Sequence, residues 1–107
     1  LKIVEKHGLP RFTPNTICDV DELMQELRVI RERGYALDNE ENEISIKCVA
    51  MPIRSGEGHS LGAISVSGPS YRYTEDRIAH YAAALQQTIA QISRYSHLLP
   101  REAVQEI

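Results

Sequence analysis

ISIKCVAMPI (residues 44–53) and SLGAISVS (residues 60–67) are the two stretches that decide the fold of this chain. Both are rich in β-branched and apolar residues, and both fit the two-residue period of a strand better than a helical period. Between them, Ser55-Gly56-Glu57-Gly58 is typical of a tight turn. The pattern therefore predicts an antiparallel hairpin whose second strand stops at Gly68-Pro69.

The turn sets the expected register of this hairpin. If Gly56 and Glu57 are the central pair of a two-residue turn, Cys48 faces Ser65. The neighbouring pairs on that face are then Ile46 with Ser67 and Ala50 with Ala63. We expect this face to be small and hydroxyl-bearing, without Arg or Lys, and the opposite face to be bulky and apolar. A longer turn would add a bulge and shift the pairing.

A first long helix is predicted over residues 19–33. Asp19 suits its N-cap, with Glu22 three residues on as the capping-box partner. Gly34 follows where a helix C-terminus favours a positive φ. Apolar residues at helical spacing include Leu27, which we expect to be buried against the sheet.

A second long helix is predicted to open at Thr74, an N-cap followed by acidic residues. Its apolar stripe includes Leu85, which we also expect to be buried against the sheet. The helix should run to about Tyr95 or His97, because Pro100 bars its simple continuation.

The predicted order of elements is helix, strand, strand, strand, helix. A short strand over residues 35–37 ends at Asp38, and residues 1–9 suit the tail of a further helix. The fold class is therefore α+β: an antiparallel sheet with long amphipathic helices packed on it. Three strands form a thin core for a domain, so we expect part of the sheet to be missing.

Composition argues against several functional classes. The net charge of -3 is unlike the basic face of most DNA-binding domains, so we expect no direct contact with DNA. Two cysteines are few for a small secreted domain, and no stretch approaches the ~20 apolar residues of a membrane helix. We expect a cytoplasmic protein without membrane contact. Because the chain begins with Leu1, we also expect a fragment or a trimmed protein.

Three segments in order carry a resemblance to a known family. They are GYALDNEE (residues 34–41), KCVAMPI (residues 47–53) and AISVSGP (residues 63–69), with RFTPNTI (residues 11–17) upstream. Together they resemble the C-terminal effector domain of IclR-type bacterial transcriptional regulators over roughly residues 10–96. One departure is Ser45-Ile46, where the family often has Gly followed by Leu or Met.

The resemblance implies a GAF-like effector domain whose N-terminal part is missing. Residues 1–97 would be the C-terminal portion of this one domain and residues 98–107 a tail. The winged helix-turn-helix would be absent, so that DNA is bound only through that separate domain. The implied partners are a small organic acid and further copies of the chain, as a dimer or tetramer. A GAF-like sensor or dimerisation module without a role in transcription is the alternative.

The resemblance further implies that Asp38, Cys48, Ser65 and Ser67 contact the effector. Hydroxyls can bind a short carboxylate through charge-assisted hydrogen bonds. Each residue also has a structural interpretation: Asp38 suits a turn cap, Cys48 a small buried hydrophobe, and the serines exposed hydroxyls. The acidic residues Glu40, Glu41 and Glu43 suit a solvated charge run.

No catalytic, metal or cofactor site is expected. Cys48 with His59 is the one plausible dyad, but the predicted turn places His59 far along the hairpin. The four histidines His7, His59, His80 and His97 lack the spacing of metal ligands.

Overall fold

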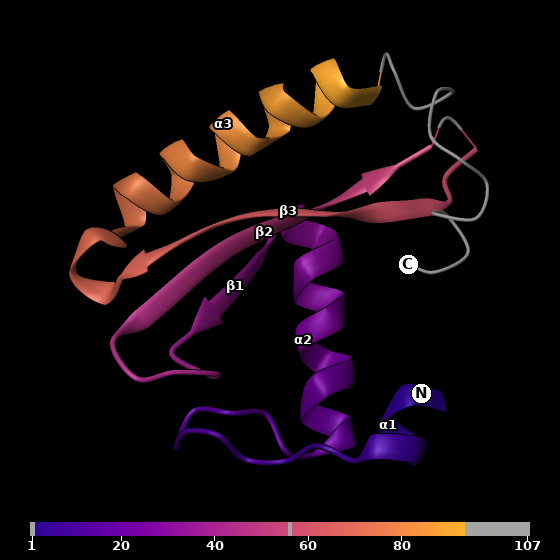
Figure 1. Ribbon diagram of the computed structural model, residues 1–107, viewed down its shortest axis with the longest axis vertical. Helices are drawn as coiled ribbons and strands as arrows, with labels where there is room; N and C mark the ends of the chain where they lie inside the picture. Colours follow the sequence, from indigo (N-terminus) through magenta and orange to yellow (C-terminus); the bar gives the residue numbers. More distant parts are fainter. Residues whose placement is uncertain (1, 56, 94–107) are drawn as a thin grey trace.

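The computed structural model describes residues 2–55 and 57–93, which form one three-stranded antiparallel sheet with helices on both faces (Figure 1). The strands lie in the order β1-β2-β3. Their bounds are Ala36–Asn39 for β1, Ile46–Arg54 for β2 and Ser60–Pro69 for β3. The predicted α+β class is confirmed.

Helix α2 (Val20–Arg33) has the ends that the sequence predicted. Asp19 Oδ2 accepts a 3.1 Å hydrogen bond from the Glu22 backbone N–H, which satisfies one free donor of the first turn. Gly34 adopts a left-handed φ of 93°, and its N–H donates to Ile30 O at 2.8 Å. Before it, the short helix α1 (Lys2–His7) lies near the start of α2, away from the sheet (Figure 1).

Helix α3 (Glu75–Ser93) covers one face of the sheet and builds the core with it. Thr74 Oγ1 accepts from the Arg77 N–H at 3.3 Å, as expected of an N-cap. Leu85, 4% exposed, packs with Val49, which is fully buried, so the predicted burial of Leu85 is confirmed. The predicted extension to Tyr95 or His97 lies outside the described residues.

Tyr73 closes one end of this core after the 3-10 turn η1 (Ser70–Arg72). Its hydroxyl donates to Val66 O at 2.8 Å, and its ring centroid lies 5.2 Å from that of Tyr81. A Cβ on Gly68 would lie 3.5 Å from the Tyr73 ring, an ordinary van der Waals distance, so the ring lies directly against β3. Burial raises the pKa of Tyr73 above its ordinary value, and the charges of Cys48 and Tyr81 raise it further.

Helix α2 lies on the other face and is held less closely than the sequence predicted. It has no buried residue, and Leu27 is 37% exposed, so the prediction that Leu27 is buried against the sheet is wrong. Its half-buried Leu23 and Ile30 border hollows that Ala36 and Ala50 also line. The sheet presents small side chains on this face. They are too short to cover the other apolar residues of α2, such as Leu27.

The hairpin register differs by two residues from the predicted one. Cys48 lies opposite Ser67, and Ala50 lies opposite Ser65. The connection is longer than a two-residue turn: the Ser55 N–H donates to His59 O at 2.8 Å, and the Gly58 N–H to Ser55 O at 2.9 Å. Gly56, one of the two predicted central residues, lies outside the described residues.

The two ends of the hairpin also depart from the prediction. A bulge separates the pair Ile53 and Gly62 from the pair Arg54 and Ser60, which leaves Leu61 as the extra residue. At the other end, β3 continues through Gly68 to Pro69 instead of stopping there. Proline is tolerated because β3 lies at an edge of the described sheet.

Candidate functional site

The corrected register brings the four predicted residues to one sheet face, opposite α3. Asp38 of β1 pairs with Cys48 of β2, which pairs with Ser67 of β3, so the three form a row across the sheet. The next row holds Ala36, Ala50 and Ser65. Cys48 and Ser65 still share a face because a shift by two residues preserves the alternation of side chains.

A hollow of about 240 Å³ lies between α2 and this face. Asp38 and Cys48 line it on the sheet side, with Leu23, Glu26 and Ile30 opposite on α2. Ser65 and Ser67 are exposed and do not line this hollow. The structure therefore brings Asp38 and Cys48 into one cavity and leaves the two hydroxyls on the open part of the same face.

Asp38 caps the turn that follows β1. Its Oδ1 accepts a 2.8 Å hydrogen bond from the Glu41 backbone N–H, as its structural interpretation predicted. In the described part of the chain, no hydrogen bond engages Oδ2. Cys48 is half-buried, and its thiol makes a weak 3.8 Å contact with Val49 O. Asp38 Oδ2 thus remains available for a ligand, and the Cys48 thiol lines the hollow beside it.

Two members of the acidic run also make hydrogen bonds to the backbone at exposed positions. Glu40 Oε1 accepts from the Ser45 N–H at 2.6 Å, and Glu41 Oε2 accepts from the Asn39 N–H at 2.9 Å. Glu43 is exposed, as expected. Glu40 and Glu41 therefore shape the turn between β1 and β2.

Sequence reasoning missed the segment that holds this turn. Three side chains of residues 11–17 donate to turn carbonyls: Thr13 to Glu40, Asn15 to Asn39 and Thr16 to Glu41. These bonds span 24 to 27 residues, so no local periodicity predicts them. The close spacing of the hydroxyls in Thr13-Pro14-Asn15-Thr16 was the available signal.

The expected absence of Arg and Lys from the small-residue face is wrong at its far end. Strand β2 extends to Arg54, which strand alternation places on the face of Cys48 and Ala50. Arg54 and Arg31 border a separate hollow of about 270 Å³. Between it and Asp38, a further hollow of about 310 Å³ is lined by Ala50, Ala63 and their neighbours.

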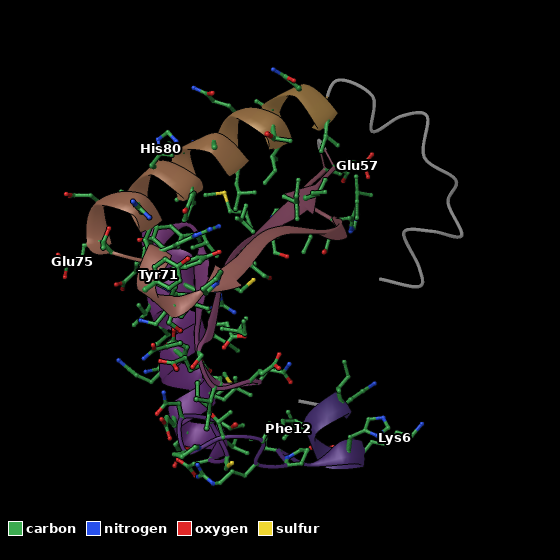
Figure 2. The ribbon with its side chains drawn as sticks, turned by 60° about the vertical axis from the view of Figure 1, so that its left-hand side comes forward. Lys6, Phe12, Glu57, Tyr71, Glu75 and His80 are labelled. Carbon is green, nitrogen blue, oxygen red and sulfur yellow. The ribbon has the colours of Figure 1, made fainter. Side chains whose placement is uncertain are left out.

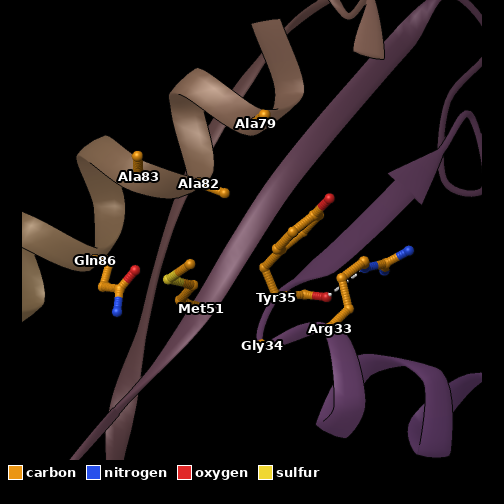
Figure 3. A pocket seen from close by; sticks show the side chains of 8 residues that line it. All are labelled: Arg33, Gly34, Tyr35, Met51, Ala79, Ala82, Ala83 and Gln86. Atoms are coloured by element: carbon orange, nitrogen blue, oxygen red, sulfur yellow. Dashed lines mark hydrogen bonds between the residues drawn. The ribbon is translucent and has the colours of Figure 1, made fainter. Parts of the chain in front are cut away.

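The face under α3 carries a hollow of its own, of about 410 Å³ (Figure 3). Tyr35 and Met51 line it below Ala79, Ala82 and Ala83 of α3. The Arg33 guanidinium lies 4.6 Å from the Tyr35 ring centroid, and Arg33 Nε donates to Tyr35 O at 3.0 Å. This hollow is separated by the sheet from the four predicted residues.

The described ranges hold neither a candidate metal site nor a membrane-spanning helix. There, no group of three or more His, Cys, Asp and Glu side chains could hold a metal ion. No helix in those ranges is long and apolar enough to cross a membrane. His59 lies in the connection beyond β2, where its Nε2 is 3.7 Å from Glu57 Oε2, whereas Cys48 lies within β2.

The sequence matches a known family along most of its length. The family model for the bacterial transcriptional regulator IclR C-terminal domain matches residues 1–94. The chain belongs to the IclR family. It is similar to the HTH-type transcriptional repressor AllR of Escherichia coli K12, with 39% identity over 93 residues. That match covers 87% of this chain and 34% of AllR, so the chain spans about a third of the curated relatives' length.

Solved structures of IclR-family proteins have the same fold. The Thermotoga maritima IclR matches with a TM-score of 0.82 and 42% identity, over 87% of this chain and 38% of that one. The inducer-binding domain of a PobR double mutant from Acinetobacter, solved with 3-hydroxybenzoic acid, matches with a TM-score of 0.77 and 26% identity. It covers 86% of this chain and 53% of its own.

Proposed function

We propose that this IclR-family domain binds a small organic acid on the sheet face opposite α3, and that binding controls DNA contact by a separate domain. One observation carries the proposal: Asp38, Cys48 and Ser67 form one row, and a hollow of about 240 Å³ adjoins Asp38 and Cys48. Family membership supports the regulatory role, since relatives such as AllR are transcriptional repressors. The 3-hydroxybenzoic acid held by the PobR domain supports the ligand class.

The four residues have three roles in this proposal. Ser65 and Ser67 donate hydrogen bonds to the carboxylate of the acid. Asp38 Oδ2 accepts from a hydroxyl of the same ligand, and Cys48 provides a small wall. The two serine hydroxyls are exposed, where water competes for hydrogen bonds. We therefore expect strong binding by the whole protein and weak binding by this part alone.

The remaining expectations about the whole protein belong to the same proposal. The described residues are the C-terminal portion of one effector-binding domain, and the expected tail over residues 98–107 lies outside the described residues. The regulator is a cytoplasmic homo-oligomer, a dimer or tetramer, that contacts DNA only through a winged helix-turn-helix outside this chain. It has no catalytic role, since the relatives' known task is repression. A sensor without a role in transcription is disfavoured on the same ground.

Removal of the two hydroxyls tests the proposed site. Thermal shift and titration calorimetry of the whole protein would use glycolate, lactate and 3-hydroxybenzoate. Hydrogen bonds to a charged group contribute ~1.5–3 kcal/mol each, so Ser65→Ala with Ser67→Ala should weaken binding at least about tenfold. Thr88→Val is the control, because that hydroxyl donates to Ala84 O within α3. Unchanged affinity in the double variant, or no binding of any acid by the wild type, contradicts the proposal.

A further inference from the structure

We propose that Thr13 and Thr16 are positioning residues for the Asp38 carboxylate and thereby set a preference for hydroxy acids. The inference rests on the proposed function, because Asp38 is taken as the acceptor for the ligand hydroxyl. Thr13 and Thr16 lie in the segment between α1 and α2, where Figure 2 labels Phe12. They act on Asp38 through the backbone of the turn after β1.

The two hydroxyls tie the segment to that turn. Thr13, 5% exposed, donates to Glu40 O at 2.5 Å and accepts from the Asn15 N–H at 3.0 Å. Thr16 donates to Glu41 O. Each hydroxyl therefore serves as donor and acceptor at once, which a valine of the same shape cannot reproduce.

The segment holds the second threonine from its own backbone. Thr16 Oγ1 accepts from the Phe12 N–H at 3.1 Å and from the Thr13 N–H at 2.9 Å. With these two acceptor positions filled, the hydroxyl hydrogen is left for Glu41 O. The Thr13 and Thr16 hydroxyl oxygens are 3.4 Å apart, a longer contact than either hydroxyl makes to the turn.

The turn needs such support because its backbone is strained. Glu40 and Ser45 adopt positive φ values of 57° and 72°, which residues other than glycine rarely adopt. Such conformations persist only where surrounding contacts hold them. Here the contacts are the Thr13 bond to Glu40 O and the Ser45 N–H bond to Glu40 Oε1.

Because the turn after β1 is held in place, it fixes the orientation of the Asp38 carboxylate. The Glu41 N–H donates to Asp38 Oδ1, and the same residue's carbonyl accepts from Thr16. With Oδ1 engaged, Oδ2 presents its lone pairs in one direction from a side chain that lines the hollow. A ligand hydroxyl gains from this fixed acceptor, whereas a ligand without one does not.

The selectivity of the whole protein for lactate over propionate tests this role, because the two acids differ by one hydroxyl. Thr13→Val and Thr16→Val should each reduce the ratio of lactate to propionate affinity by about tenfold. Thr13→Ser and Thr16→Ser retain the hydroxyl and should restore the ratio, and Thr88→Val should leave it unchanged. A merely structural role would weaken both acids equally, and that result, or an unchanged ratio, overturns the inference.

Amide exchange provides a readout without ligand. The valine variants should speed hydrogen exchange at the Glu41 amide by about tenfold, and the serine variants should not. If the wild type binds none of the acids tested, the proposed function fails, and exchange at Glu41 still decides whether the threonines position Asp38. If a valine variant does not fold, Asn15→Ala removes the exposed 2.9 Å bond to Asn39 O for the same comparison. Wild-type exchange in folded variants contradicts the inference.

Discussion

Cys48 and Ser67 are direct cross-strand partners in the β2–β3 ladder, and their side chains leave the sheet on the face opposite α3. Direct partners in antiparallel strands have Cα atoms ~4.5–5.5 Å apart, whereas diagonal neighbours are ~7–8 Å apart. Ser65 is the diagonal neighbour of Cys48. The proposed effector site therefore has a geometry that chemical cross-linking can test.

Ser67→Cys should form a disulfide with Cys48 under mild oxidation. The expected Cα separation falls within the ~4.4–6.8 Å range of disulfides, and that of Ser65→Cys falls outside it. Peptide mapping by mass spectrometry would locate the bond and separate it from any bond to Cys18. If Cys48 forms a disulfide in the Ser65→Cys variant but not in the Ser67→Cys variant, Cys48 lies opposite Ser65. The register would then be that of a two-residue turn.

Leu85→Ala should lower the free energy of unfolding by ~2–5 kcal/mol, because it opens a cavity under α3. Leu27→Ala is the matched control on α2 and should cost less than about 1 kcal/mol, since Leu27 is already exposed. Urea unfolding of the two variants measures the difference. Equal losses would mean that α2 is packed as closely as α3.

Tyr73→Phe should destabilise the protein less as pH rises above 10. Burial, then the charges of Cys48 and Tyr81, raise the pKa of folded Tyr73 above its ordinary value of 10.0. Its contribution to stability is therefore complete below pH 10 and is lost as pH rises through the folded pKa. Below pH 10 the variant should lose ~0.5–1.5 kcal/mol with the bond to Val66 O. Urea unfolding at pH 8 and 10.5 measures the stability difference between the wild type and Tyr73→Phe, with Tyr71→Phe as the control because Tyr71 is exposed. A difference that grows with pH contradicts the prediction.

Local signals predicted much of the fold. Asp19 and Gly34 predicted both ends of α2, because caps act on the nearest backbone groups. The shared face of Cys48 and Ser65 was predicted despite the wrong register, because the error was an even number of residues. Two-residue alternation is thus a stronger signal than the length of a turn.

Features that depend on distant partners could not be predicted in this way. The helical stripe of α2 includes Leu27, but a stripe does not show how closely the facing sheet approaches. The bonds from Thr13 and Thr16 to the turn after β1 join segments far apart in sequence. A bulge was expected only for a turn longer than two residues, and its place between Ile53 and Arg54 was not predicted. Tertiary packing decides each of these.

Alkylation of Cys48 tests the central claim most directly. Cys48 and Cys18 are both free and half-buried, and only Cys48 lies on the proposed site, so Cys18 is an internal control. Iodoacetamide labelling of the whole protein, followed by mass spectrometry, would compare the two rates with and without saturating lactate, glycolate or 3-hydroxybenzoate. An acid that raises the melting temperature should slow the labelling of Cys48 and leave that of Cys18 unchanged. Stabilisation by an acid with no selective protection of Cys48 would contradict the proposed site.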